Sequence, residues 1–199
     1  MAKVIAISGA QGAGKSTLLE ELKSRGFYID SFKVSRSVQE SLGFTSLNDA
    51  TATLPIGVGF QEKIFEAKLK HDKQLNELPY DVVLVERSFA DIYAYSLQWV
   101  KKHSTFDKTQ SNATLWSFRF KQQCLAAQKL CYNGCILLPY MDHMVWQEDV
   151  RRADKNSVDS VYNEIIKFTE SSGKSMLQIS EKTVGARAVQ VQNFLKELS

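Results

Sequence analysis

The chain has 199 residues, of which 44% are hydrophobic and 24% are charged, and its formal net charge is +3. This is ordinary globular composition, and the length is most simply one domain over residues 1–199. The small positive charge suits a protein that handles phosphorylated small molecules and does not by itself demand a nucleic-acid partner. No apolar run could span a bilayer and no leader precedes the first strand, so we expect a cytoplasmic protein without a membrane partner.

The first predicted elements are a strand over Val4–Ile7, a glycine-rich loop and a helix over Ser16–Ser24. In this setting the spacing Gly-x-x-x-x-Gly-Lys-Ser/Thr predicts a phosphate-binding P-loop, whose backbone N–H groups and helix N-terminus face one anion. We expect Lys15 to reach the β- and γ-phosphates and the Ser16 hydroxyl to bind Mg²⁺. The predicted nucleotide-binding residues are Gly9, Ala10, Gln11, Gly12, Ala13, Gly14, Lys15, Ser16 and Thr17.

A second strand is predicted over Phe27–Ile29, with polar residues directly after it. Asp30 could act there as a general base for an acceptor hydroxyl, or Asp30 or Ser31 could cap the following helix. Lys33 and Arg36 are three residues apart and would share a helix face. This pair could hold an acceptor phosphate, or it could be an ordinary solvated pair.

Two helices and a long connection are expected next. The helices cover Val34–Leu42 and Gly59–Leu78, and the irregular stretch Gly43–Gly57 lies between them. This stretch could be a mobile substrate lid or a plain surface connection.

The third strand, Val82–Val85, is followed by Glu86 and Arg87 and then by a helix over Asp91–His103. A carboxylate leaving a buried strand is where a Walker B acid would lie, so Glu86 could orient Mg²⁺ or accept a proton. Arg87 could neutralise the transferring phosphoryl group or hold the acceptor. A buried structural Glu–Arg pair is the alternative, but ligands of open α/β sheets gather at this edge.

A polar break over Ser104–Ser111 precedes a predicted helix over Asn112–Tyr132. Cys124, Cys131 and Cys135 lie close together, but no second paired spacing supplies a fourth metal ligand. We therefore expect buried, reduced thiols.

The fourth strand, Cys135–Leu138, leads into a charge-dense segment before the helix that contains residues 158–166. Arg151 and Arg152 are predicted to belong to a lid over about residues 140–156, where they would close over the phosphates. A solvated arginine pair is the alternative.

The fifth strand, Met176–Ile179, is followed by a helical stripe from Val184 to Leu198. This edge of a P-loop sheet would lie near the base of the nucleotide, so Arg187 could pack on the purine. A helix start capped by Ser180 or Thr183 explains the same residues without a ligand.

Short apolar strands that alternate with helices predict a parallel sheet covered on both faces. The fold class is therefore α/β: a three-layer α/β/α sandwich with five strands.

Three short motifs accompany the P-loop: Glu86-Arg87-Ser88 with Asp91 and Tyr95, Glu148-Asp149-Val150-Arg151, and Gly185-Ala186-Arg187. Together they resemble the P-loop kinases of the nucleoside and nucleotide kinase group. The first motif is similar to deoxyribonucleoside kinases and, through Tyr95, to thymidylate kinases. The other two look more like small AAA-type kinases, which include nicotinamide riboside kinase domains and phage-encoded deoxynucleoside monophosphate kinases.

The resemblance implies strand order 2-3-1-4-5, ATP with Mg²⁺, and phosphoryl transfer to a nucleoside, nucleotide or base. It places these residues at the site: Lys15 and Ser16 on the donor side, Asp30 or Glu86 near an acceptor hydroxyl, Arg87 on the acceptor side, and Arg151 and Arg152 in the lid. The chain departs from deoxyribonucleoside kinases after its second strand, where it has no Glu-Pro followed by a Trp. An acceptor that is already a phosphate would need no strong base, because its oxygen is anionic.

The leading hypothesis is therefore an ATP-dependent deoxynucleoside monophosphate kinase of phage type, acting on a small-molecule nucleotide in the cytoplasm, the host cytoplasm if phage-encoded. Lys33 and Arg36 would then clamp the acceptor phosphate. The alternatives are a kinase for a nucleoside or for a hydroxymethylated base or strand end in DNA, and a P-loop NTPase that needs no acceptor. The oligomeric state stays open, a homodimer included.

Overall fold

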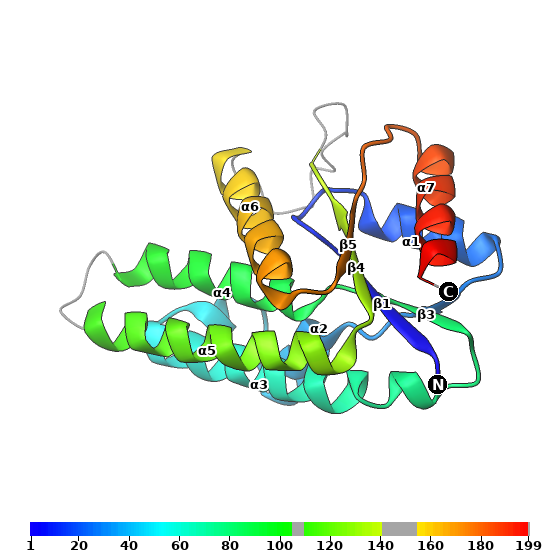
Figure 1. Ribbon diagram of the computed structural model, residues 1–199. Helices are drawn as coiled ribbons and strands as arrows, with labels where there is room; N and C mark the ends of the chain where they lie inside the picture. Colours follow the sequence, from blue (N-terminus) through cyan, green and yellow to red (C-terminus); the bar gives the residue numbers. More distant parts are fainter. Residues whose placement is uncertain (105–109, 141–154, 199) are drawn as a thin grey trace.

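A computed structural model describes residues 1–104, 110–140 and 155–198. Its core is a parallel sheet with strand order β2-β3-β1-β4-β5 (Figure 1). The strands are β1 Lys3–Gly9, β2 Tyr28–Asp30, β3 Val82–Glu86, β4 Gly134–Leu138 and β5 Ser175–Gln178. All five predicted strands and the strand order expected from the resemblance are confirmed.

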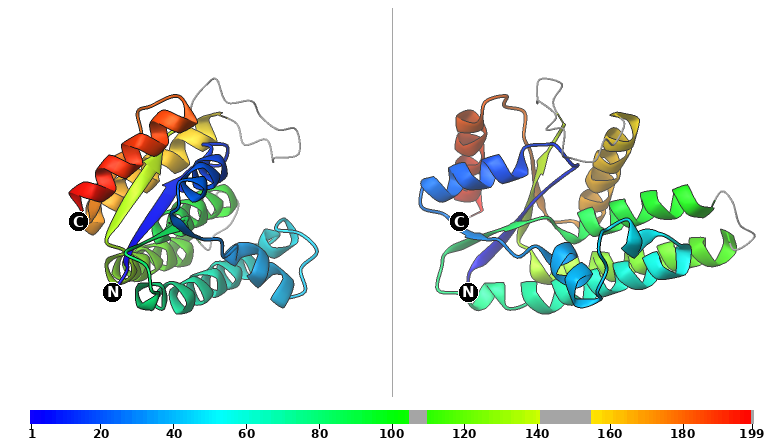
Figure 2. Two further views of the ribbon diagram at one scale, coloured as in Figure 1. Left: turned by 90° about the vertical axis from the view of Figure 1, so that its right-hand side faces the viewer. Right: turned by 180° about the vertical axis from the view of Figure 1, so that it is seen from behind.

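Helices cover both faces of the sheet, so the predicted three-layer α/β/α fold is confirmed. In Figures 1 and 2, α1 and α7 lie together on one face, and α3 to α6 cover the other. The helices are α1 Lys15–Ser24, α2 Val34–Ser41, α3 Leu54–Asp72, α4 Phe89–Ser104, α5 Gln110–Cys131, α6 Lys155–Ser172 and α7 Val184–Glu197, with short 3-10 turns at Asp49–Thr51 and Leu75–Glu77. None of the described helices is long and apolar enough to cross a membrane.

Successive side chains of the central strands belong alternately to two separate hydrophobic clusters. Val4 and Ala6 of β1 join the cluster beneath α3 to α6, whereas Ile5 and Ile7 join the cluster beneath α1 and α7. Because both faces are buried, the strands read as continuous apolar runs in the sequence. Because all the strands are parallel, their carboxyl ends lie at one edge of the sheet, where the P-loop begins.

The third helix differs from its expected range of Gly59–Leu78. It begins at Leu54 and ends at Asp72, so the irregular stretch expected over Gly43–Gly57 stops at Thr53 and includes a 3-10 turn. A proline in the first helical turn is tolerated because the N–H groups there need no intrahelical acceptor. Gly57 lies inside the helix and leaves room for the Trp99 ring, because a Cβ at this position would come within 2.1 Å of it.

The three cysteines are free and buried, which confirms the prediction of reduced thiols. Burial raises the pKa of the Cys135 thiol to about 12 and that of Cys131 to about 11. These thiols therefore stay protonated and pack as small apolar groups.

Candidate active site

The P-loop leaves the carboxyl end of β1 and leads into α1. Gly14, the residue before the helix, has φ 81°, in the left-handed region that favours glycine. At Gly9 the constraint is space, because a Cβ would lie 2.5 Å from the Leu138 carbonyl oxygen at the end of β4. The fold thus requires these two glycines.

Lys15 lies at the centre of the donor side with only 5% of its surface exposed. Its ammonium group donates hydrogen bonds to the carbonyl oxygens of Gly9 at 2.7 Å and Ala10 at 2.8 Å. Burial and, to a smaller extent, the Arg87 cation lower the pKa of Lys15 to about 8, while Asp91 and Glu86 act in the opposite direction. A cation this poorly solvated is stabilised strongly by any anion that enters the loop.

Glu86 and Arg87 lie beside the loop, as the sequence predicts. Glu86 ends β3 and is in register with Ile7 of β1. Arg87 has φ 65°, and no other non-glycine residue in the described part of the chain has a positive φ. Its N–H donates to the Ile7 carbonyl at 2.9 Å, and its guanidinium lies 5.3 Å from the centre of the Tyr95 ring. Such backbone strain is typical of functional sites.

The first two turns of α4 bind the P-loop directly, a role that the sequence reasoning missed. The buried Asp91 carboxylate accepts hydrogen bonds from the N–H groups of Gly9 at 3.3 Å and Ser88 at 2.8 Å. The Tyr95 hydroxyl accepts from the Gln11 N–H at 2.8 Å. Asp91 and Tyr95 are four residues apart, which is the one sequence signal that places both on the same face of a helix.

Asp30 ends β2 at the same edge, but neither it nor Ser31 caps α2. Lys33 occupies the N-cap position, without a side-chain capping bond, so the capping alternative was wrong. The Asp30 carboxylate accepts a 3.3 Å hydrogen bond from the Phe32 N–H and lies 3.4 Å from the ring Nε2 of His71. Lys33 and Arg36 are exposed on the first turn of α2. Nothing in the sequence predicts the contact between Asp30 and His71.

Arg187 connects the P-loop to the start of α7. Its side chain is buried and donates to the carbonyl oxygens of Glu181 at 2.8 Å and Ala13 at 3.4 Å. Thr183 caps α7 by accepting from the Ala186 N–H, so the capping alternative is confirmed for Thr183. A contact between Arg187 and a purine stays a prediction.

Arg151 and Arg152, with most of the expected lid, lie outside the described residues.

The predicted Mg²⁺ ligands are Ser16 and Glu86. In the described ranges, no three His, Cys, Asp or Glu side chains form a group that could hold a metal ion. The exposed Ser16 hydroxyl and the half-buried Glu86 carboxylate are nevertheless oxygen donors of the kind that Mg²⁺ uses together with water and phosphate oxygens. The residues present therefore fit the expected ion.

The fold has known counterparts among nucleoside and nucleotide kinases. A deoxyadenosine kinase from M. mycoides, with products dCMP and dCDP bound, matches with TM-score 0.64 and 16% identity over 98% of this chain and 99% of that chain. A thymidylate kinase from Candida albicans matches with TM-score 0.63 and 14% identity over 98% and 92%. A NadR protein in complex with NR matches with TM-score 0.71 and 13% identity over 99% of this chain and 51% of that one.

A search of curated proteins found no match. The family model described as "AAA domain" matches residues 4–187, a span that begins in β1, ahead of the P-loop, and ends at Arg187. The chain belongs to this AAA-domain family and has the fold of the P-loop nucleoside and nucleotide kinases.

Proposed function

We propose that the protein transfers the γ-phosphoryl group of ATP, with Mg²⁺, to a deoxynucleoside monophosphate. The observation that carries this proposal is a complete P-loop with Arg87 held beside it in a strained backbone conformation. The cationic residues Lys33 and Arg36 follow the neighbouring strand β2. The thymidylate kinase, which is named for a monophosphate acceptor, supports this acceptor class, whereas dCMP is a product of the deoxyadenosine kinase and fits a nucleoside acceptor.

The chemistry consists mainly of positioning and charge neutralisation. The bond between the γ-phosphorus and the β–γ bridging oxygen breaks as a bond to an oxygen of the acceptor phosphate forms in line. The electron pair of the broken bond stays on ADP. Lys15 and Arg87 would offset the charge on the moving group, and Arg151 and Arg152 would close over it. No strong base is needed, because the acceptor oxygen is already anionic.

Ser16 and Glu86 are the residues that would hold Mg²⁺. The ion, when bound, supplies charge neutralisation across the β- and γ-phosphates. Arg187 lies in the first turn of α7, and this helix start would flank the base of the nucleotide, where Arg187 would pack.

Asp30 favours a second candidate, transfer to a hydroxyl of a nucleoside or of DNA. A carboxylate at this edge, with 11% of its side chain exposed, could take the proton of such a hydroxyl. This alternative requires a base, whereas transfer to a phosphate does not.

The experiment that tests the proposal measures ADP release with a panel of acceptors: deoxynucleoside monophosphates, nucleosides, nicotinamide riboside, and DNA with and without hydroxymethylated bases. We expect release that depends on a deoxynucleoside monophosphate. Turnover with nucleosides alone would favour the hydroxyl acceptor, and turnover with DNA that falls steeply with salt would favour a DNA kinase. Equal ATP consumption with and without acceptor would identify a plain NTPase, and each of these results contradicts the proposal.

A further inference from the structure

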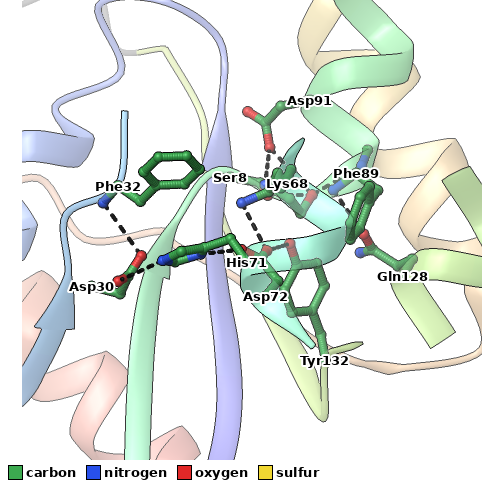
Figure 3. A network of polar contacts seen from close by, with 12 residues as sticks. Ser8, Asp30, Phe32, Lys68, His71, Asp72, Phe89, Asp91, Gln128 and Tyr132 are labelled. Atoms are coloured by element: carbon green, nitrogen blue, oxygen red, sulfur yellow. Dashed lines mark hydrogen bonds and ion pairs between the residues drawn. The ribbon is translucent and has the colours of Figure 1, made fainter. Parts of the chain in front are cut away.

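One imidazole ring joins the acceptor edge to a buried ionic cluster (Figure 3). His71, in the last turn of α3, places Nε2 3.4 Å from an oxygen of Asp30 and Nδ1 2.9 Å from an oxygen of Asp72. The Phe32 ring stacks on it, with ring centres 4.3 Å apart and an interplanar angle of 25°. Two carboxylates from different elements thus contact the two nitrogens of a single side chain.

Asp72 is the buried end of this series of contacts from Asp30 through His71. Its carboxylate is fully buried and lies 2.9 Å from the Lys68 ammonium, and it also accepts a hydrogen bond from the Tyr132 hydroxyl. Burial, followed by the charge of Asp72, raises the pKa of Tyr132 well above its usual value, so this hydroxyl is a neutral donor. A buried carboxylate with such partners is held in place, and losing one partner would be costly.

Asp30 is the partly exposed end of the same series. Besides His71, the described residues give it one backbone donor, the Phe32 N–H, and its side chain keeps 11% exposure at the edge where β1, β2 and β3 end. Each ring nitrogen of His71 thus lies beside an oxygen of a different carboxylate, so the ring joins Asp30 to Asp72.

We propose that His71 is a positioning residue for the acceptor: anchored by Asp72 and by the Phe32 ring, it holds Asp30 through the contact of Nε2 and fixes that carboxylate toward a hydroxyl group of the bound acceptor. This rests on the proposed phosphoryl transfer at the same edge. Asp30 accepts the hydrogen bond of the hydroxyl, whether that group lies on the sugar of a monophosphate or is itself the acceptor. His71 acts through Asp30 and does not touch the donor side.

Two conservative substitutions separate the two contacts. His71→Gln keeps an N–H donor near the Nε2 position, whereas His71→Asn keeps one only near Nδ1. Using the best acceptor of the panel, we expect His71→Asn to lower kcat/KM for the acceptor about tenfold, because the polar contact to the Asp30 carboxylate is lost, and His71→Gln to stay within about threefold of wild type. The KM for ATP should stay unchanged in both. Lys70→Ala, an exposed residue of the same turn, is the control.

A double-mutant cycle with Asp30→Asn tests whether the effect passes through Asp30. In the Asp30→Asn background, we expect His71→Asn and His71→Gln to have equal acceptor kcat/KM. Phe32→Leu loosens the stacking but keeps every polar group, and it provides the same cycle if His71→Asn fails to fold, with an expected loss of about threefold.

The outcomes separate this inference from the function on which it rests. Wild-type protein that turns over none of the acceptors overturns both. Wild-type turnover with unchanged acceptor kcat/KM in His71→Asn, with losses that add to those of Asp30→Asn, or with an equal rise in the KM for ATP overturns the role of His71 alone.

Discussion

The donor and acceptor sides of the candidate site are built in different ways. The donor side is one contiguous segment, Gly9–Thr17, shaped by glycines and braced by α4 and by Arg187. The proposed acceptor side combines the end of β2, the start of α4 and the last turn of α3. A phosphate site can therefore be encoded in a short motif because backbone N–H groups do the binding. Recognition of an acceptor depends on side chains that only the folded chain brings together.

The largest effect should come from removing the donor-side ammonium. Lys15→Ala should lower the transfer rate by about 10²–10³-fold, because the moving phosphoryl group loses a preorganised cation. The fold should persist, since burial of this group lowers its pKa and its charge is held at a cost. Transfer rates at saturating acceptor and thermal melts check this, with the exposed Lys23→Ala of the same helix as control. Full activity in Lys15→Ala would show that the donor side is assigned wrongly.

Asp91→Asn should break the link between the two sides. The amide keeps a single acceptor oxygen and brings an NH₂ group toward the N–H groups of Gly9 and Ser88, so about 2 kcal/mol of unfolding free energy should be lost. ATP should also bind more weakly, because the loop loses an anchor. Urea unfolding and ATP titration measure the two effects, and the exposed Asp159→Asn is the matched control. Wild-type stability would exclude Asp91 as a clamp.

The pKa of Lys15 predicts a pH dependence confined to the donor side. Nucleotide phosphates need the charged ammonium, whose pKa of about 8 lies below its usual 10.5. The affinity of the free protein for ATP should therefore fall by about tenfold between pH 7 and pH 9, with uptake of a proton on binding. Over pH 8 to 10.5 the unfolded chain binds more protons at this residue, so Lys15 should make the stability of the free protein rise with pH.

Calorimetric ATP titrations in two buffers of different ionisation enthalpy measure this linkage. Lys15→Arg keeps its charge throughout, so its affinity should stay level over the same range. An identical decline in both proteins would assign the pH dependence to another group.

The smallest effects should come from the exposed cations of the acceptor side. Lys33→Ala and Arg36→Ala should each raise the acceptor KM by about two- to fivefold, since exposed charges interact weakly. The effect should shrink as salt is added, and the KM for ATP should not change. Steady-state kinetics at two ionic strengths test this, with Lys167→Ala on α6 as control. An unchanged acceptor KM would place the acceptor phosphate elsewhere.

Much of the fold could be predicted because its strands are short apolar runs buried on both faces. The start of α3 could not, because Pro55 and Gly57 usually signal a loop. Here the proline lies in the first turn and the glycine accommodates Trp99, a contact between segments far apart in the chain.

The P-loop could be located from its spacing, and Glu86 and Arg87 from their place after a strand. The contacts of Asp91 and Tyr95 with the loop could not, because they depend on how α4 packs beside β1. His71 was missed because its partner Asp30 belongs to another element, and nothing in the local sequence relates them. The bonds of Arg187 to the carbonyl oxygens of Glu181 and Ala13 could not be predicted either, because Ala13 belongs to another element, and the contact of Arg187 with a purine stays a prediction.

The most direct test of the central claim follows the label of γ-³²P-ATP in the presence of a deoxynucleoside monophosphate. The account predicts that label appears in the acceptor in equal amount to the ADP released, and that little ADP forms without acceptor. Label found only in inorganic phosphate, at a rate that ignores the acceptor, would contradict it.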